Sequence, residues 1–117
     1  MIEYNTVILF KSEPMLNCQN ADIPDKPTIT SFGEQEHGMT LNLTCKTPDA
    51  KPADNLTYTW MKNGTVLTVG NSDTYVLSPL HLTMDDGMYT CSVSNLVGEG
   101  ETSAETDVYV KCKYINC

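Results

Sequence analysis

The sequence predicts an all-β fold in which two antiparallel sheets pack face to face with Greek-key connections. Short segments of alternating apolar and polar residues recur along the chain, separated by turns rich in Gly, Pro, Asn and Asp. Cys45, Trp60 and Cys91 also follow one another at the spacing found in sandwiches that bury a tryptophan between two sheets. Such a domain needs about 100 residues, so the 117-residue chain has room for one domain.

The predicted domain covers residues 27–111. Residues 1–26 form an N-terminal extension, and residues 112–117 form a C-terminal stub. The segment 4–10 has the composition of one strand, and Pro24 and Pro27 keep the chain that follows extended. Two interpretations of the extension stay open. It is the tail of a preceding domain or a disordered leader, or it adds an edge strand to the sandwich.

Strands and turns alternate from Pro27 onward. The predicted strands are residues 27–32, 39–46, 56–61, 65–69, 74–80, 88–94 and the segment that follows the turn at 98–100. Asn63-Gly64 predicts a tight hairpin turn between the third and fourth strands. The sheet to which residues 65–69 belong stays open. Trp60 and Cys91 are too close in sequence for the additional strands of a variable-type sandwich, so the domain is expected to be compact.

Period-two alternation assigns the side chains to the two faces of each strand. Asn42 and Thr44 are predicted to point outward. The inward residues are Leu41, Leu43, Cys45, Leu56, Tyr58, Trp60, Tyr89, Cys91, Val93, Ala104, Thr106, Val108 and Val110.

Three motifs extend this pattern. They are Gly38-x-x-Leu41-x-Leu43-x-Cys45, Trp60-x-Lys62-Asn63-Gly64 and Asp85-x-Gly87-x-Tyr89-x-Cys91-x-Val93-x-Asn95-x-x-Gly98. With them the chain resembles I-set and C2-set domains of the immunoglobulin superfamily over residues 27–111. The resemblance implies a Cys45–Cys91 disulfide and a buried Trp60. It also implies a tyrosine corner in which the Tyr89 hydroxyl bonds back to the backbone, with Asp85 and Gly87 shaping the turn.

The sequence departs from the family pattern at one point. Between Leu80, the last inward residue of its strand, and Asp85 there is one residue more than the family usually has. Two explanations stay open, a longer corner before Asp85 or a bulge in the strand at 74–80.

The charge pattern excludes several classes of partner. The net charge is −8, and all seven basic residues are lysines that form no cluster. Nucleic acids, heparin-like polyanions and anionic membrane surfaces are therefore not expected partners. Sialic acid recognition of the sialoadhesin kind depends on an arginine that grips the sugar carboxylate, and lysine does not replace it. The absence of arginine argues against direct binding of sialic acid.

Cysteines and glycosylation motifs predict an exported protein. The chain has five cysteines, many for a cytosolic domain. Asn42, Asn55 and Asn63 each begin an N-linked glycosylation motif. The first residues lack the charge and length of a signal peptide and no membrane span is visible, so the chain is expected to be part of a longer protein.

The remaining cysteines leave several pairings open. Cys18–Cys112 is barely within reach, and Cys112–Cys117 would close a small loop. Three cysteines cannot all pair within one chain, so at least one has an outside partner or stays a thiol.

No catalytic, cofactor or metal site is predicted. The chain has no nucleophile elbow and no phosphate-binding glycine loop. His37 and His81 lack the spacing of zinc ligands and are interpreted as surface residues.

The sequence therefore predicts a non-catalytic extracellular module for protein binding or adhesion, in a multi-domain cell-surface protein. The candidate partner face contains Thr59, Met61, Ser92 and Tyr109, and the expected occupant is another protein or a second copy of the chain. The plain alternative is a solvated face of a spacer domain. A secreted immune-recognition protein and a structural module of muscle-protein type are the other functional hypotheses.

Overall fold

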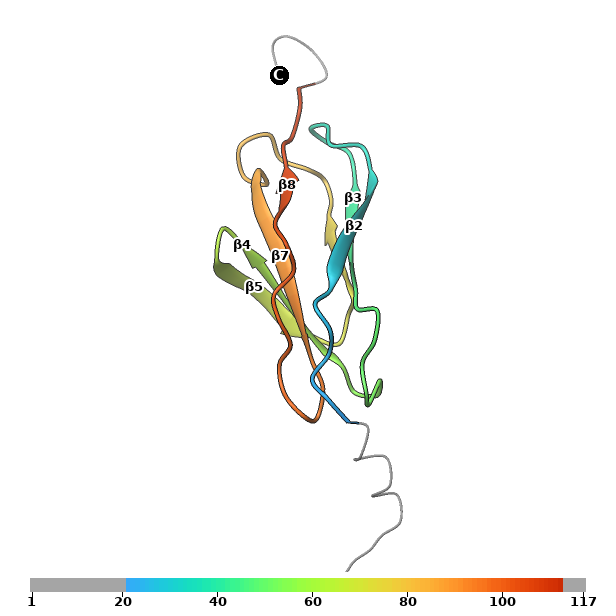
Figure 1. Cartoon of the computed structure of the whole chain (residues 1–117). Helices are drawn as coiled ribbons and strands as arrows, with labels where there is room; N and C mark the ends of the chain where they lie inside the picture. The colour runs from blue at the N-terminus through green and yellow to red at the C-terminus, as the bar shows by residue number, and fades with distance from the viewer. Residues whose placement is uncertain (1–20, 113–117) are drawn as a thin grey trace, which may run out of the picture.

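The computed structural model describes residues 21–112, which form two antiparallel sheets (Figure 1). One sheet has the order β2–β3–β6, with strands Thr28–Gly33, Leu41–Lys46 and Thr74–Leu77. The other has the order β5–β4–β7–β8, with strands Thr65–Gly70, Thr57–Lys62, Gly87–Ser94 and Thr106–Val108. The predicted all-β sandwich of two sheets is confirmed. The strand after Asn63-Gly64 pairs with β4, so it lies in the four-stranded sheet.

The core lies between the sheets and follows the alternation of three strands. Leu41, Leu43 and Cys45 point inward from β3, and Trp60 points inward from β4. Tyr89, Cys91 and Val93 point inward from β7, and Leu56 and Tyr58 pack against the cluster while staying partly exposed. Complete burial of a valine or leucine side chain stabilises the fold by about 1.5–3 kcal/mol. The Nε1 atom of Trp60 is buried without a hydrogen-bond partner among the described residues.

The strand predicted at 74–80 is shorter than expected. β6 ends at Leu77, because Pro79 has no N–H group with which to continue the ladder. Leu80 is nevertheless buried. The loop that precedes β3 holds it, since Leu80 N–H donates to the Met39 carbonyl and the Leu80 carbonyl accepts from Gly38 N–H.

The additional residue before Asp85 lies in the corner. The pairing of β6 with β3 runs without a register shift, so β6 contains no bulge. The residues after Leu80 instead form a turn in which His81 and Asp85 hydrogen-bond to each other. Asp85 N–H donates to the His81 carbonyl at 3.2 Å, and His81 N–H donates to the Asp85 carboxylate at 2.6 Å.

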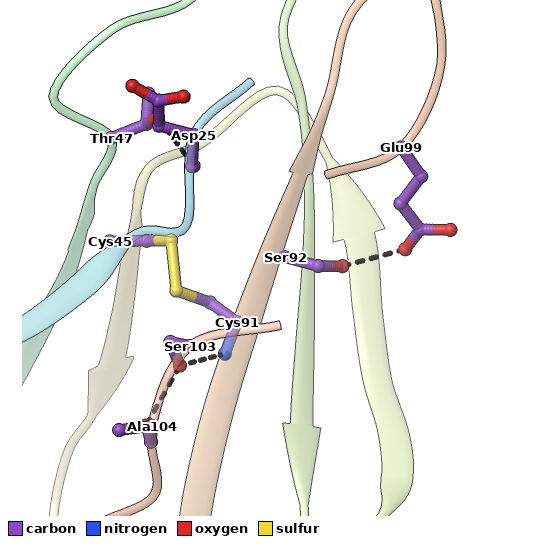
Figure 2. The surroundings of a disulfide bond; sticks show 8 residues. All are labelled: Asp25, Cys45, Thr47, Cys91, Ser92, Glu99, Ser103 and Ala104. Atoms are coloured by element: carbon purple, nitrogen blue, oxygen red, sulfur yellow. Dashed lines mark hydrogen bonds between the residues drawn. A yellow bond between two sulfur atoms is a disulfide. The ribbon is translucent and has the colours of Figure 1, made fainter. Parts of the chain in front are cut away.

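The last strand departs from the predicted alternation. Ala104 was expected inside but is exposed, and its neighbour Ser103 is 7% exposed. Ser103 faces the β7 backbone (Figure 2), where its hydroxyl accepts the Cys91 N–H at 3.0 Å and its own N–H donates to the Cys91 carbonyl at 2.8 Å. A side chain therefore takes the place of a ladder carbonyl, and regular pairing begins only at Thr106.

Residues 21–26 pack against one pole of the sandwich. Pro24 is fully buried. The backbones of Asp22 and Lys51 form an isolated antiparallel β-bridge. The amide of Asn95 donates to the Asp22 carbonyl at 2.7 Å. A Cβ atom at Gly100 would collide with the Pro24 carbonyl oxygen, so this close approach requires glycine. The strand predicted at residues 4–10 lies outside the described residues.

Candidate functional site

A disulfide between Cys45 and Cys91 joins the two sheets (Figure 2). It connects β3 with β7 across a Cα–Cα distance of 6.3 Å. Trp60 is the β4 residue that pairs with Cys91, and it is 1% exposed. Its indole therefore lies beside the cross-link and fills the space between the sheets. This arrangement gives the domain a rigid centre on which both outer faces are supported.

Tyr89 forms the corner that precedes β7. Its hydroxyl donates to the Asp85 carbonyl at 2.8 Å. Burial, together with the nearby Asp85, Tyr75 and Asp86, raises the pKa of Tyr89 to about 12. The Asp86 carboxylate accepts the Val110 N–H at 2.6 Å, which holds the segment after β8 to the same corner. These contacts are structural, and they leave the phenol neutral at physiological pH.

Gly87 completes this corner with a backbone conformation that suits glycine. Its φ is 155°, and a Cβ atom there would press on the Lys62 and Asn63 side chains. Lys62 crosses the ring of Tyr89 at 5.9 Å and donates to the Met84 carbonyl. The glycine therefore leaves room for a lysine that ties β4 to the corner.

The two histidines lie together, which the sequence did not predict. The rings of His37 and His81 meet edge to face at 5.5 Å. The Nδ1 atom of His37 accepts the Leu82 N–H, and that of His81 accepts the Thr83 N–H. Among residues 21–112 no group of three or more metal-binding side chains is present. The pair thus acts as acceptors for two backbone donors of the corner turn.

The three glycosylation motifs lie in different surroundings. Asn42 is the middle residue of a cross-strand row on the outer face of the three-stranded sheet. Asn55 and Asn63 are exposed turn residues with φ of 55° and 52°. The Asn63 side-chain oxygen also accepts the Met88 N–H at 2.9 Å. Only Asn42 therefore has cross-strand neighbours.

The candidate partner face is the outer face of the four-stranded sheet. Thr59 and Met61 are both partly exposed there. The register places Val69 beside Thr59 and Val66 beside Met61, and Thr90 flanks Met61 on β7. We call these five residues the β5–β4–β7 face. Val66 is 55% exposed and Val69 is 59% exposed, so an uncharged apolar strip follows the sheet edge.

Sequence reasoning missed Val66 and Val69. Val66 and Val69 are three positions apart, so period-two alternation alone would place them on opposite faces of the strand, and the pattern does not show which sheet the strand joins. The pairing of β5 with β4 decides this, and an irregularity opposite Trp60 and Met61 moves Val66 next to Met61.

Ser92 points to this face, opposite Thr59, but it is buried there. The side chain is 1% exposed, because its hydroxyl donates to a Glu99 carboxylate oxygen at 2.8 Å and the Glu99 side chain lies over it (Figure 2). Period-two alternation gives the face of the sheet to which a side chain points, but it does not report a neighbouring loop that covers that face.

Tyr109 is exposed but belongs to a different surface from Met61. It is 65% exposed and lies beyond the end of β8, where its N–H donates to the Gln35 side chain. With Phe32 it lines an open groove of about 860 Å³, whose other lining residues are Gly33, Glu34, Gln35, Asp107 and Lys111. The candidate residues Met61 and Tyr109 are therefore not brought together by the fold.

Cys112 is disulfide-bonded, and Cys18 and Cys117 lie outside the described residues. The described part of the chain contains no helix that is long and apolar enough to span a bilayer.

The fold, the inter-sheet disulfide and the tyrosine corner define a disulfide-linked β-sandwich domain. A family model described as "Immunoglobulin domain" matches residues 26–95, more than half of the chain. The chain belongs to the immunoglobulin domain family. This family is generally non-catalytic.

Two curated relatives and one solved structure agree with this assignment. The chain is 26% identical to basigin from Gallus gallus over 104 residues, which are 76% of this chain and 26% of that protein. It is 34% identical to protein sidekick-2 from Gallus gallus over 87 residues, which are 65% of this chain and 4% of that protein. The second Ig-C2 domain of human Fc-receptor like A superimposes with a TM-score of 0.61 at 18% identity, covering 74% of this chain and 96% of that domain.

The chain thus spans only a small part of the curated relatives that it matches. The likeness to the solved domain shows the fold, the two-sheet sandwich that the sequence predicts.

Proposed function

We propose that this chain is an extracellular recognition or adhesion module of a multi-domain cell-surface protein, and that the β5–β4–β7 face binds a protein partner, including a second copy of the chain. The observation that carries this proposal is the apolar strip on that face. Val66, beside Met61, and Val69, beside Thr59, are each more than half exposed, and no charged residue lies among the five members. Protein interfaces are depleted of charge at their centres and enriched in methionine.

The proposed location in the secretory pathway rests on covalent chemistry. A disulfide such as Cys45–Cys91 persists in oxidising compartments and is rare in the cytosol. Asn55 and Asn63 are exposed turn residues, which suits a glycan that must project into solvent. Neither residue is a member of the β5–β4–β7 face, although Asn63 lies in the turn that joins β4 to β5.

A second role, as a spacer between other domains, is favoured by the path of the chain. The described chain enters at one pole, beside the loop between β7 and β8, and leaves at the opposite pole (Figure 1). A domain with this path can be joined in line with neighbours on both sides without blocking either sheet. The partner-binding role and the spacer role differ in whether the β5–β4–β7 face has an occupant.

The experiment that tests the partner face uses the chain secreted from mammalian cells and displayed on beads. Val66→Lys with Val69→Lys places charge in the strip, and Met84→Lys is the control because Met84 is 66% exposed in the corner before β7, outside the strip. We expect wild-type beads to aggregate, or the labelled chain to bind cells in flow cytometry. The double variant should lose this binding and the control should keep it. Equal binding by all three proteins would contradict the proposed face, and a wild type that binds nothing would favour the spacer role.

The full-length transcript around this segment separates membrane-anchored from secreted parents. A signal peptide, further domains of this kind and a membrane span would establish a cell-surface protein. A signal peptide without a span would establish the secreted alternative. A transcript with no export signal would contradict the proposed location.

A further inference from the structure

The outer face of the three-stranded sheet carries an arrangement that the proposed function does not use. Register pairing places Phe32, Asn42 and Val76 in one row across β2, β3 and β6. Leu41 and Leu43 are fully buried, so Asn42 between them points away from the core. The asparagine and the threonine of the motif Asn42-Leu43-Thr44 therefore both lie on the outer face of the central strand.

The neighbours of Asn42 in this row are apolar and uncovered. Phe32 is 79% exposed and Val76 is 54% exposed. Residues directly opposite in antiparallel strands have Cβ atoms about 4.5–5.5 Å apart, so both side chains adjoin the asparagine. Within residues 21–112 the Asn42 side-chain amide makes no hydrogen bond. An aromatic ring exposed on the outer face of a sheet contributes little stabilisation until another group covers it.

We propose that Asn42 carries an N-linked glycan whose first N-acetylglucosamine lies on the ring of Phe32, with Val76 on its other side. The inference rests on the proposed passage through the secretory pathway and goes beyond it, because it names the group that covers this sheet. The Asn42 Nδ2 atom attacks C1 of an oligosaccharide carried on a lipid diphosphate. The C1–N bond forms and the C1–O bond to the diphosphate breaks. The amide loses one proton, and the lipid diphosphate leaves.

The stacking follows from the chemistry of the two rings. One face of a pyranose presents several C–H bonds, whose hydrogens carry a small positive charge. The face of an aromatic ring is negative, so it attracts such hydrogens while apolar area is removed from water. The first sugar is joined directly to the Asn42 amide, and Phe32 lies directly across the strand pair. The first sugar is therefore close enough to contact the ring by itself, and no later sugar of the glycan is needed for this contact.

The other two motifs provide an internal contrast. Asn55 and Asn63 lie in turns outside the paired strands, so they have no cross-strand aromatic neighbour. A glycan at either position projects into solvent and is expected to affect the stability of the fold only slightly. Asn55→Gln is accordingly the matched control for Asn42→Gln.

The test is a double-mutant cycle on the full chain secreted from mammalian cells, with glycan occupancy measured by peptide mass spectrometry. We expect Asn42 to be occupied. Asn42→Gln and Phe32→Ala should each lower Tm by about 3–6 °C, and the double variant should fall no further than either single variant. Asn55→Gln should shift Tm by less than about 1 °C. In protein made in bacteria, which carries no glycan, Phe32→Ala should leave Tm unchanged within the same margin.

Proton NMR of the glycosylated chain supplies a direct readout. Protons of the first sugar on Asn42 should shift upfield through the ring current of Phe32, and the shift should vanish in Phe32→Ala.

Each contrary outcome assigns the surface differently. Occupancy at Asn55 without occupancy at Asn42 overturns this inference and leaves the proposed location intact, whereas a chain that carries no glycan at any motif and is not secreted contradicts both. Additive Tm losses in the cycle overturn the stacking contact. If glycan-free protein self-associates and Phe32→Ala abolishes that association, the row is an interface between copies instead.

Discussion

The two sheets cover the same core, yet their outer faces differ in composition and in what surrounds them. The three-stranded sheet places an asparagine with a glycosylation motif between Phe32 and Val76. The four-stranded sheet presents the uncharged β5–β4–β7 face, none of whose five members is the asparagine of such a motif. The inward side chains hold the sheets together and set the stability of the domain. The outward side chains are free of that constraint, so the difference between the faces indicates what each one meets in solution.

The largest expected effect comes from removing the side chain of Trp60, which packs between the two sheets. Trp60→Ala opens a cavity next to the disulfide and should lower the free energy of unfolding by about 3–5 kcal/mol, which weakens the support of both outer faces. Trp60→Phe should cost clearly less, because the ring still fills most of the space and the unpaired indole N–H is removed. Urea unfolding of the two variants measures the difference. Equal losses would show that Trp60 does not act by filling volume.

The disulfide is the next largest contribution. Cys45→Ala with Cys91→Ala opens a loop with a sequence separation of 46, and the free energy of unfolding should fall by about 3–4 kcal/mol. The unfolding midpoint in denaturant reports this loss, with the singly substituted Cys45→Ala as a comparison. A change well below 1 kcal/mol would mean that packing alone holds the sheets together.

Tyr89→Phe has a smaller effect, and it depends on pH. Loss of the hydrogen bond to the Asp85 carbonyl should cost about 1 kcal/mol at pH 7. The pKa of Tyr89 is raised from 10.0 to about 12 in the folded state. The neutral phenol is therefore favoured by folding, and its contribution is complete below pH 10 and lost as the pH rises toward 12.

Over that interval the wild type should lose about 1–2 kcal/mol more than Tyr89→Phe, a value reduced for the solvent near the hydroxyl. Denaturant unfolding of both proteins between pH 9 and 12 measures this difference, and lysine titration cancels because both contain the same lysines. Parallel stability curves would contradict the assignment of the raised pKa.

The smallest expected effect compares the two outer faces directly. Val69→Thr and Val76→Thr remove similar exposed area from opposite sheets, so in glycan-free protein each should change stability by less than about 0.5 kcal/mol. In the glycosylated chain Val76→Thr should cost more than Val69→Thr, because the sugar on Asn42 packs against Val76. Thermal unfolding of both forms checks this, and the same small loss in all four samples would remove the distinction between the faces.

The side chains that point into the core could be predicted from the sequence, because alternation and spacing are local properties of the chain. The burial of Leu41, Leu43, Tyr89 and Val93 follows from period two, and the positions of Cys45 and Cys91 follow from the family pattern. In the last strand the local rule fails at Ala104, where the Ser103 hydroxyl replaces a ladder partner. That failure depends on a contact with β7, which is distant in sequence.

The neighbours of side chains on the outer faces of the two sheets were decided by the pairing of strands in the tertiary structure. The amino-acid sequence by itself determined the sandwich, its cross-link, its tyrosine corner and the acidic, arginine-free surface. Only the folded chain placed β5 beside β4, laid Glu99 over Ser92 and set Phe32 opposite Asn42. The physical reason is that alternation states which way a side chain points, whereas its neighbours depend on the register between strands that are far apart in the chain.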